Sequence, residues 1–434
     1  MQQQYRLKNE SLESMSRLVK KFGGTSVADI DKIRKAAEIA VKAASEGHEV
    51  TTVVSAMGDT TDRLITMAEE ITRSPNAREM DMLLTTGEQV SIALMSMAIQ
   101  SLGYEARSFT GAQAGIMTGS QYGYARIEEV QPDAIQASLA RGEIAVVAGF
   151  QGVTDRNELT TLGRGGSDTT AVALAAALNA DCCDIYTDVD GVYTADPRIL
   201  PEARRLDSIS YEEMMELSAT GAQVLATRSV ELAMDQDVPL RVRSTFKPMD
   251  PGTLVGNRVS VPEYMVAGIS CDTNQVSVML KGTRSTNTKT KPADGLGSLF
   301  TRLQELNIQT DMVMLLAHED ASSFEAFQEI AFSVDKKYLA RVKGLIDTFS
   351  ESLGNPRVSL ETEMAKISVV GRRFSSRPEM VANVFETLQA GGIPVNMVAT
   401  GDLRMSMLMP KTYAVRAVKL IHDCFGLAEG SFLA

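Results

Sequence analysis

The chain of 434 residues is 44% hydrophobic and 23% charged, a composition typical of a soluble globular protein with two or three domains. Its net charge of −12 argues against a nucleic-acid partner, so any anionic ligand must be held by local positive sites. No apolar run reaches the roughly 18 residues of a membrane span, and we expect neither a membrane partner nor a secretory signal.

Cysteines and histidines are not predicted to carry the chemistry. The four cysteines lack the spacing of metal ligands, and adjacent Cys182 and Cys183 lie in a strand-like stretch, which is typical of reduced core thiols in a cytoplasmic protein. The three histidines are scattered, and none of them, His422 included, lies near a candidate motif. Residues 1–17 are polar, and we expect a flexible N-terminal extension.

The first predicted element is a strand over residues 17–22 that runs into Gly23 and Gly24 and then into a helix. Such a turn lets backbone N–H groups converge at a helix N-terminus, which favours an anion. Lys20 and Lys21 end the strand, and because neighbouring side chains of a strand point to opposite faces, only one of them can enter this site. A basic strand end before an ordinary turn is the simpler alternative.

Two further candidate sites lie beside or within a predicted helix. A buried-type strand over residues 50–55 ends at Ser55, and the helix after it begins beside Thr61. The predicted helix over residues 78–102 contains Glu88, but a lone glutamate on a helix usually lies on a solvated face. The residues alone therefore do not single out Glu88.

The densest local pattern is the run LTTLGRGGSDTTA, which an alanine-rich helix follows. Gly165 and Gly166 permit a tight turn, and we expect Ser167 or Asp168 to cap the helix. The helix dipole favours an anion at the turn, and Arg164 adds a planar fork that can grip a carboxylate or a phosphate. A glycine turn before a capped core helix is the alternative explanation.

A strand from residue 182 leads into a polar loop whose side chains suit a nucleotide. Its Asp-Val-Asp-Gly sequence resembles part of a calcium loop, but the later ligands and the closing glutamate are absent. A loop at the edge of a nucleotide fits better, with Tyr193 against the base and Arg198 near the phosphates. A polar turn ended by Pro197 is the alternative.

Strands alternate with helices through residues 18–257, which predicts a doubly wound α/β domain. Prolines and glycines from Pro248 to Gly256 indicate a boundary. The remainder repeats an approximate β-α-β-β-α order, which predicts two ferredoxin-like modules over residues 264–350 and 351–434 that can interleave. Such modules bind small ligands or pair with one another.

Five junctions in this order resemble those of the aspartate kinases. The matching sequences are Lys21–Ser26, Ser55–Asp62, Gly87-Glu88, Leu162–Asp168 and Thr187–Arg198. The C-terminal modules are similar to that family's ACT domains. The resemblance implies an α/β fold in which an amino-acid-kinase-like doubly wound sheet domain is followed by two ferredoxin-like (ACT) modules.

The resemblance also implies a reaction: transfer of the γ-phosphoryl group of ATP, with Mg²⁺, to the side-chain carboxylate of L-aspartate, the first step towards lysine, threonine, methionine and diaminopimelate. When the roles of the family are transferred to the matching positions, Lys21 is expected to neutralise the phosphoryl oxygens and Asp168 to orient the reacting groups. The implied aspartate-binding residues are Thr61, Glu88, Arg164, Gly165, Gly166 and Ser167. The implied ATP-binding residues are Lys21, Gly23, Gly24, Ser55, Thr187, Asp188, Tyr193, Asp196, Arg198 and Gln223.

The chain departs from the family in places that bear on regulation. Gln223 stands where the family often has a lysine, and Leu315 stands where the first ACT module has a glutamine. The effector-binding residues placed by the resemblance are Asp294, Asp311, Leu315, Thr400 and Asp402. Because leucine offers no partner to the ammonium or carboxylate of an amino acid, we expect inhibition by lysine or threonine to be weak, absent or altered.

Two alternatives stay open at this point. A kinase acting on glutamate, acetylglutamate, carbamate or UMP is disfavoured by the C-terminal modules and by the Gly87-Glu88 sequence. A catalytically impaired homologue that senses an amino acid is kept open by Gln223 and the altered modules. The paired modules imply a homodimer or a larger homo-oligomer.

Overall fold

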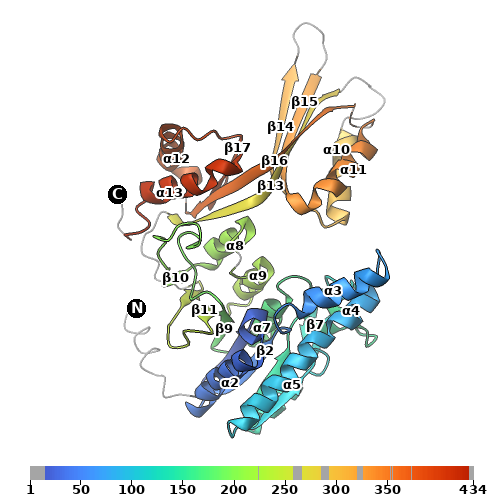
Figure 1. Cartoon of the computed structure of the whole chain (residues 1–434), viewed down its shortest axis with the longest axis vertical. Coiled ribbons are helices and arrows are strands. Elements are labelled where there is room, and N and C mark those ends of the chain that lie inside the picture. Colours follow the sequence, from blue (N-terminus) through green and yellow to red (C-terminus); the bar gives the residue numbers. More distant parts are fainter. Residues whose placement is uncertain are drawn as a thin grey trace. The chain divides into compact units, whose positions relative to one another are not determined.

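A computed structural model describes residues 15–222, 224–257, 266–284, 293–319, 326–351, 353, 355–372 and 374–429 (Figure 1). The chain divides into two compact units. The first unit holds the described residues of Met1–Val192, Arg205–Ser218 and Gln223–Pro262. The second holds those of Tyr193–Arg204, Ala219–Ala222 and Glu263–Ala434.

The first unit is built on an eight-stranded sheet in the order β10-β12-β11-β9-β1-β2-β6-β3. All neighbouring strands are parallel except the pair β11 and β12. Valine-rich strands buried on both faces are typical of such parallel sheets. The strands are β1 Arg17–Phe22, β2 Glu49–Val54, β3 Ala106–Phe109, β6 Ile144–Ala148, β9 Cys182–Thr187, β10 Ser208–Ile209, β11 Leu240–Ser244 and β12 Thr253–Val255.

Helices cover both faces of this sheet, as the alternating sequence predicts. Buried side chains of α2 and α5 form one core with β1, β2 and β6, while α7 contacts β1, β2 and β9. The helices are α2 Ile30–Ser45, α3 Thr60–Ile71, α4 Ala77–Leu84, α5 Thr86–Ser101, α6 Asp133–Ala140, α7 Gly166–Ala177, α8 Tyr211–Thr220 and α9 Thr227–Asp235, with the short 3-10 helix η1 Gly24–Val27. The single helix expected over residues 78–102 is two helices that meet at Thr85.

A second sheet in this unit is absent from the sequence prediction. Its four strands run in the order β5-β4-β7-β8. They are β4 Ile116–Thr118, β5 Ile127–Val130, β7 Gln151–Val153 and β8 Leu159–Thr161. Strand β8 leads directly into the glycine loop before α7.

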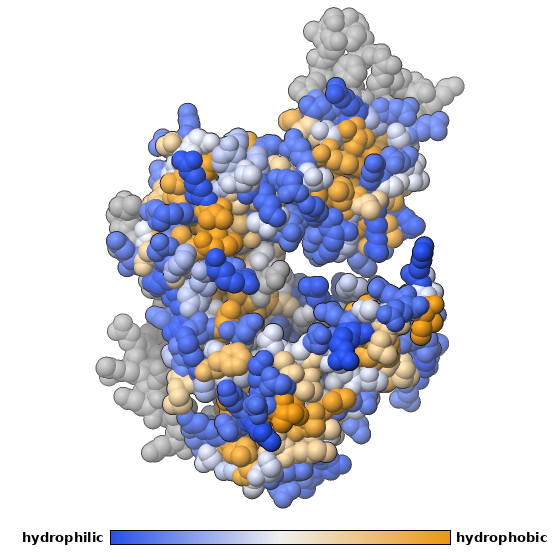
Figure 2. Space-filling view, in the orientation of Figure 1, coloured by the Kyte–Doolittle hydropathy of each residue, from blue (hydrophilic) through white to orange (hydrophobic). Residues whose placement is uncertain are grey.

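The stretch Ala77–Ser101 is long and apolar enough to cross a membrane by length and composition, with a mean hydropathy of 1.3 over its best window. Half of that window is buried inside the protein, and α5 packs against α2 and β3. On the visible face, hydrophobic and hydrophilic residues are interspersed (Figure 2). The stretch therefore has the character of core helices.

The second unit is a six-stranded antiparallel sheet in the order β14-β15-β13-β16-β18-β17. The predicted β-α-β-β-α order occurs twice, and the long neighbours β13 and β16 join the two modules. The elements are β13 Val266–Arg284, α10 Ala293–Glu305, β14 Thr310–Glu319, β15 Ala326–Asp335, η2 Lys336–Tyr338, α11 Leu339–Phe349, β16 Arg357–Gly371, η3 Phe374–Ser376, α12 Pro378–Ala390, β17 Met397–Thr400, β18 Arg404–Pro410, η4 Lys411–Tyr413 and α13 Ala414–Cys424.

Candidate active site

The carboxyl ends of three parallel strands bring the first candidate residues to one edge of the sheet. The N–H of Gly23 donates to the carbonyl of Tyr186 at 3.2 Å, and the N–H of Ser55 donates to the carbonyl of Phe22 at 3.1 Å. The ends of β1, β2 and β9 are thereby tied together beside Thr187. Ligands of open α/β sheets bind at such an edge.

Gly24 is required by the close approach of two loops. A Cβ at this position would lie 3.0 Å from the carbonyl oxygen of Ala56 and 3.3 Å from that of Gly58. The carbonyl of Gly24 also accepts from the N–H of Gly58 at 3.1 Å. The turn after β1 and the turn after β2 therefore form one backbone surface.

The two lysines of β1 serve opposite faces of the sheet, as predicted. The Lys21 ammonium lies 2.6 Å from Oδ1 of Asp168, an ion pair between side chains that are each 11% exposed. The Lys20 ammonium lies 2.8 Å from Oδ2 of Asp184 and is buried. Lys21 is thus the lysine that meets the start of α7.

Helix α7 begins differently from the expectation. Its N-cap is Gly165, which has φ +72° and makes no side-chain cap hydrogen bond, so the prediction of a Ser167 or Asp168 cap is wrong. Two separate features require glycine at this position. The backbone conformation is left-handed, and a Cβ would lie 2.2 Å from the Cβ of Ala226. Asp168 lies in the first turn of the helix, where its carboxylate is free to pair with Lys21.

Glu88 is buried, contrary to the expectation for a lone glutamate on a helix. It lies in the first turn of α5, and 2% of its surface is exposed. Oε1 accepts from the N–H of Ala56 at 3.0 Å, whereas Oε2 has no partner among the described residues. Burial raises the pKa of the carboxyl to about 7. An unpaired buried oxygen of this kind can receive a cationic group.

The remaining aspartate-binding candidates line the same two junctions. Arg164 is exposed and has no hydrogen bond or ion pair within the described chain, so its guanidinium can engage a ligand. Ser167 is buried beside Gly149, where a Cβ would lie 2.7 Å from the serine Oγ. Thr61 is half-buried at the start of α3. Gly166 is buried as the first residue of α7.

A buried carboxylate that was not predicted from the sequence shapes this site. Asp81 of α4 is fully buried and accepts four hydrogen bonds. Two come from the N–H of Gly123 at 2.9 and 3.1 Å, one from the N–H of Thr161 at 2.9 Å, and one from its hydroxyl at 2.7 Å. Thr161 ends β8, so Asp81 fixes the strand that delivers the Arg164 loop. An aspartate in the apolar sequence Met-Asp-Met-Leu-Leu is the signal that could have revealed it.

Arg228 of α9 supports the same loop from a different element. Its guanidinium donates to the carbonyl of Leu162 at 3.2 Å and to that of Ala125 at 3.4 Å. The N–H of Ala125 in turn donates to the carbonyl of Thr161 at 2.9 Å. The approach to Arg164 is therefore held by a carboxylate and a guanidinium that bind mainly backbone.

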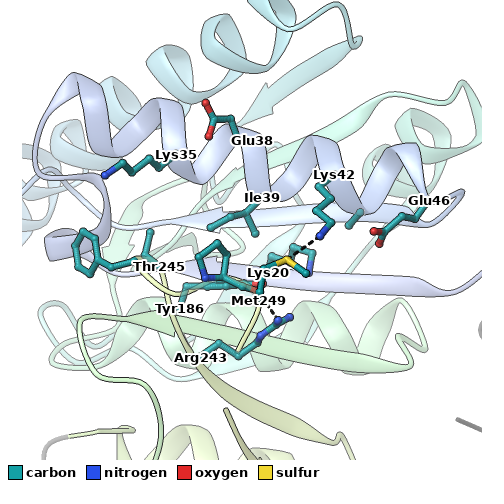
Figure 3. A pocket seen from close by; sticks show the side chains of 13 residues that line it. Lys20, Lys35, Glu38, Ile39, Lys42, Glu46, Tyr186, Arg243, Thr245 and Met249 are labelled. Atoms are coloured by element: carbon teal, nitrogen blue, oxygen red, sulfur yellow. Dashed lines mark hydrogen bonds between the residues drawn. The ribbon is translucent and has the colours of Figure 1, made fainter. Parts of the chain in front are cut away.

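A pocket of about 440 Å³ lies on the Lys20 face of the sheet (Figure 3). Neither Lys21 nor Asp168 lines it. Helix α2 contributes Lys35 and Lys42 to its lining, and the sheet contributes Lys20 and Arg243. Two cations make cation–π contacts with one aromatic ring there, because Lys20 and Arg243 each lie 5.5 Å from the ring centroid of Tyr186. The pocket holds none of the candidate catalytic residues.

The ATP candidates after β9 divide at the boundary between the two units. Thr187 and Asp188 belong to the first unit, and the threonine hydroxyl donates to the aspartate at 3.1 Å. Tyr193, Asp196 and Arg198 belong to the second unit, where Arg198 pairs with Asp196 at 2.7 Å. Gln223 lies outside the described residues.

The effector candidates all lie in the second unit. Lys366 pairs with Asp311 at 2.7 Å and Arg404 pairs with it at 3.3 Å. Burial raises the pKa of Asp311, but these two cations outweigh it and hold the pKa below its usual value. Leu315 and Thr400 are exposed on β14 and β17. Asp402 is an exposed residue whose carbonyl accepts from Phe374, and the Asp294 side chain is outside the described part.

Comparisons with known proteins agree over most of the length of the chain. A model of the amino acid kinase family matches residues 16–244, and an ACT-domain model matches residues 367–425. Aspartokinase 2 of Bacillus subtilis is 43% identical over 416 residues, which are 96% of this chain and 99% of that protein. The aspartokinase of Mycolicibacterium smegmatis is 42% identical over 418 residues, 95% and 97% of the two chains.

Solved structures give the same result. Aspartokinase III of E. coli, in complex with aspartate and ADP in its R-state, superposes with a TM-score of 0.76 at 26% identity. The match covers 94% of this chain and 99% of that one. The same enzyme in complex with lysine and aspartate in its T-state gives a TM-score of 0.73, again at 26% identity, over 94% and 98% of the two chains.

Proposed function

Because the chain belongs to the amino acid kinase family, and within it to the aspartokinases, we propose residue by residue how it carries out that family's reaction. The enzyme is an aspartate kinase: it transfers the γ-phosphoryl group of ATP to the side-chain carboxylate of L-aspartate, giving 4-phospho-L-aspartate and ADP. The observation that carries the assignment of the site is the Lys21–Asp168 ion pair at the start of α7.

Aspartate is bound between the start of α5 and the loop before α7. The unpaired Oε2 of buried Glu88 receives the α-ammonium, and the exposed guanidinium of Arg164 grips a carboxylate of the substrate. Thr61 and Ser167 add hydroxyl hydrogen bonds, and Gly165 and Gly166 keep the backbone close to the ligand. In this arrangement the ammonium and one of the two carboxylates of the amino acid each meet an opposite charge.

Phosphoryl transfer needs little more than positioning and charge stabilisation, so no protein nucleophile is required. Lys21 neutralises the oxygens of the transferring phosphoryl group, and the N-terminus of α7 adds its positive dipole end. Asp168 holds the Lys21 ammonium in place and orients the reacting groups. The aspartate side chain itself is the nucleophile.

The nucleotide is bound at the carboxyl ends of β1, β2 and β9. The residues assigned to it are Lys21, Gly23, Gly24, Ser55, Thr187, Asp188, Tyr193, Asp196, Arg198 and Gln223. Mg²⁺ enters as part of the MgATP substrate, which needs only one or two protein carboxylates. Among the described residues no three or more His, Cys, Asp or Glu side chains form a group that could hold a metal ion.

We place the enzyme in the cytoplasm as a homodimer or larger assembly formed through its ACT modules, with lysine or threonine as the candidate effector. The domain limits proposed are residues 18–257 for the kinase, 264–350 for the first ACT region and 351–434 for the second. The alternative of a catalytically impaired sensor is not favoured, because full-length relatives are aspartokinases.

The experiment that tests the function is ADP release from MgATP by the purified full-length chain, with and without L-aspartate. Aspartate-dependent release supports the assignment, and L-glutamate is the control substrate. A folded chain that binds MgADP yet releases no ADP with aspartate contradicts it and restores the sensor alternative.

A further inference from the structure

The segment Tyr193–Arg204 carries three of the residues proposed for ATP, yet it is part of the second unit. Its buried side chains Ala195, Leu200 and Ala203 join the hydrophobic core of the second ferredoxin-like module. The shape of a segment assigned to the nucleotide therefore depends on packing inside the C-terminal unit.

Thr194 is the point at which hydrogen bonds hold this segment. Its N–H donates to the carbonyl of Arg204 at 2.9 Å, and its carbonyl accepts from the N–H of Ile269 at 2.7 Å. Its buried hydroxyl accepts from the N–H of Arg204 at 3.0 Å and lies 2.9 Å from Nε2 of His422. The backbone and the side chain of Thr194 are thus both fixed within the second unit.

His422 is a polar residue on the apolar face of α13. Its side chain is fully buried beside Val418 and Ile421, which belong to the core of the second module. Within the described chain its one hydrogen bond is to Thr194, and Nδ1 has no partner. Burying an imidazole costs free energy unless its nitrogens are hydrogen-bonded. An apolar side chain would fill this position without that cost, so packing alone does not explain the histidine.

We propose that His422 is a positioning residue for the kinase reaction: through Thr194 it fixes the segment that presents Tyr193, Asp196 and Arg198 to the nucleotide. The inference rests on the proposed function, because it takes the nucleotide roles of these three residues from there. It adds a route by which α13 of the second ferredoxin-like module controls nucleotide affinity.

The test compares His422→Leu with His422→Gln in the full-length enzyme. The leucine removes the hydrogen bond and fills the space, whereas the glutamine keeps a hydrogen-bonding group near the position of Nε2. We expect the Kd for MgADP and the KM for ATP to rise about tenfold in the leucine variant, the ratio that loss of one buried hydrogen bond gives. The KM for aspartate stays unchanged, and the glutamine variant recovers most of the ATP affinity.

Thr194 provides the reciprocal pair of variants. Thr194→Val removes the hydroxyl with little change in shape, and Thr194→Ser retains it. The double variant should lose less than the sum of Thr194→Val and His422→Leu, because the two single variants share the loss of the bond between His422 and Thr194. Thr194→Val should have the larger effect of the two, because it also removes the hydrogen bond that the hydroxyl accepts from the N–H of Arg204. Ser368→Ala is the matched control: it removes a buried hydroxyl pair with Ser406 at 2.8 Å in the same unit, away from the segment.

Hydrogen exchange of residues 193–204 gives a readout that does not require activity. Faster exchange in His422→Leu, together with weaker MgADP binding, supports the proposal. Unchanged exchange or unchanged MgADP affinity overturns it while leaving the kinase assignment intact. Equal losses for ATP and aspartate, or an equal loss in Ser368→Ala, also overturn it as general destabilisation. A wild-type chain that neither binds MgADP nor forms ADP with aspartate removes the proposed function first.

Discussion

At the scale of single residues, burial decides what Glu88 can do. Helical periodicity does not report which polar residue a neighbouring loop covers, so it does not distinguish this glutamate from a solvated one. Only the family resemblance indicates a role for it. The structure supplies the cause: the loop at Ala56 covers the carboxylate and leaves one oxygen unpaired. A carboxyl with a pKa of about 7 changes charge within the range in which the enzyme can be assayed.

Activity and stability should respond to this group in opposite directions. The carboxylate binds the α-ammonium of aspartate, so kcat/KM for aspartate should rise with pH through about 7, as the free enzyme loses the proton. The folded pKa lies above the unfolded one, so the folded state binds more protons between the ordinary glutamate pKa of 4.5 and about 7. The free energy of unfolding should therefore fall as pH rises across that window.

The variant Glu88→Gln keeps an acceptor for Ala56 and removes the titration. We expect its kcat/KM for aspartate to be lower by about two orders of magnitude at pH 8 and flat across the window, because one buried charge contact is lost. Its unfolding free energy should lose the pH dependence assigned to Glu88. A steep pH dependence of kcat/KM that survives in the variant would show that another group is responsible.

Lys20 and Lys21 form a natural comparison, because they are neighbours on β1 and serve opposite faces. Lys21→Met should reduce kcat by at least about a thousandfold in a protein that still folds, since its role is in the charge of the transition state. The Asp168 carboxylate loses its ion-pair partner but stays in the first turn of α7, where the helix dipole favours a negative charge. Lys20→Met leaves the buried Asp184 with two more distant cations, Arg241 at 3.8 Å and Arg243 at 3.7 Å, so we expect a loss of about 3 kcal/mol in stability. Its kcat in the folded protein should be near normal. A folded Lys21→Met enzyme with wild-type turnover would refute the assignment.

At the scale of elements, sequence periodicity predicted the long elements and missed the short ones. The parallel strands and the double β-α-β-β-α order were predicted, because long apolar runs and alternating patterns carry clear periods. Strands β4, β7 and β8 have three residues each, too few for a period of two to be recognised. The prediction of the α7 N-cap was wrong for a local reason: Gly165 adopts the left-handed conformation and caps the helix two residues before Ser167.

The missed sheet is held to the active-site loop by Asp81, which gives a prediction about loop geometry. Asp81→Asn would place amide hydrogens against the N–H groups of Gly123 and Thr161. We expect a loss of about 3 kcal/mol in unfolding free energy, measured by denaturant titration, because the amide cannot accept all the hydrogen bonds that the buried carboxylate accepts. Thr161→Val removes only the hydroxyl contact and should cost about 1 kcal/mol. Equal stability of Asp81→Asn and wild type would show that these hydrogen bonds do not hold the loop.

At the scale of the whole molecule, regulation is the property that the sequence leaves to experiment. Asp311 is already paired with Lys366 and Arg404, and Leu315 offers no polar group, so we expect lysine and threonine to inhibit weakly. Leu315→Gln restores the residue of the family and should increase sensitivity in a titration of ADP release. Leu316→Gln is the matched control, since the two leucines are 55% and 54% exposed. Strong inhibition of the wild-type enzyme by either amino acid would contradict the prediction.

The way the chain passes between its two units limits how this protein can be recombined. The backbone leaves the first unit after Val192, returns at Arg205, leaves again after Ser218 and returns at Gln223. A gene fusion joined near residue 257 would transplant the kinase together with Ala195 and Leu200 but without the core that buries them. Exchange of regulatory halves between relatives should therefore succeed only when the donor also supplies side chains that fit the transplanted segment.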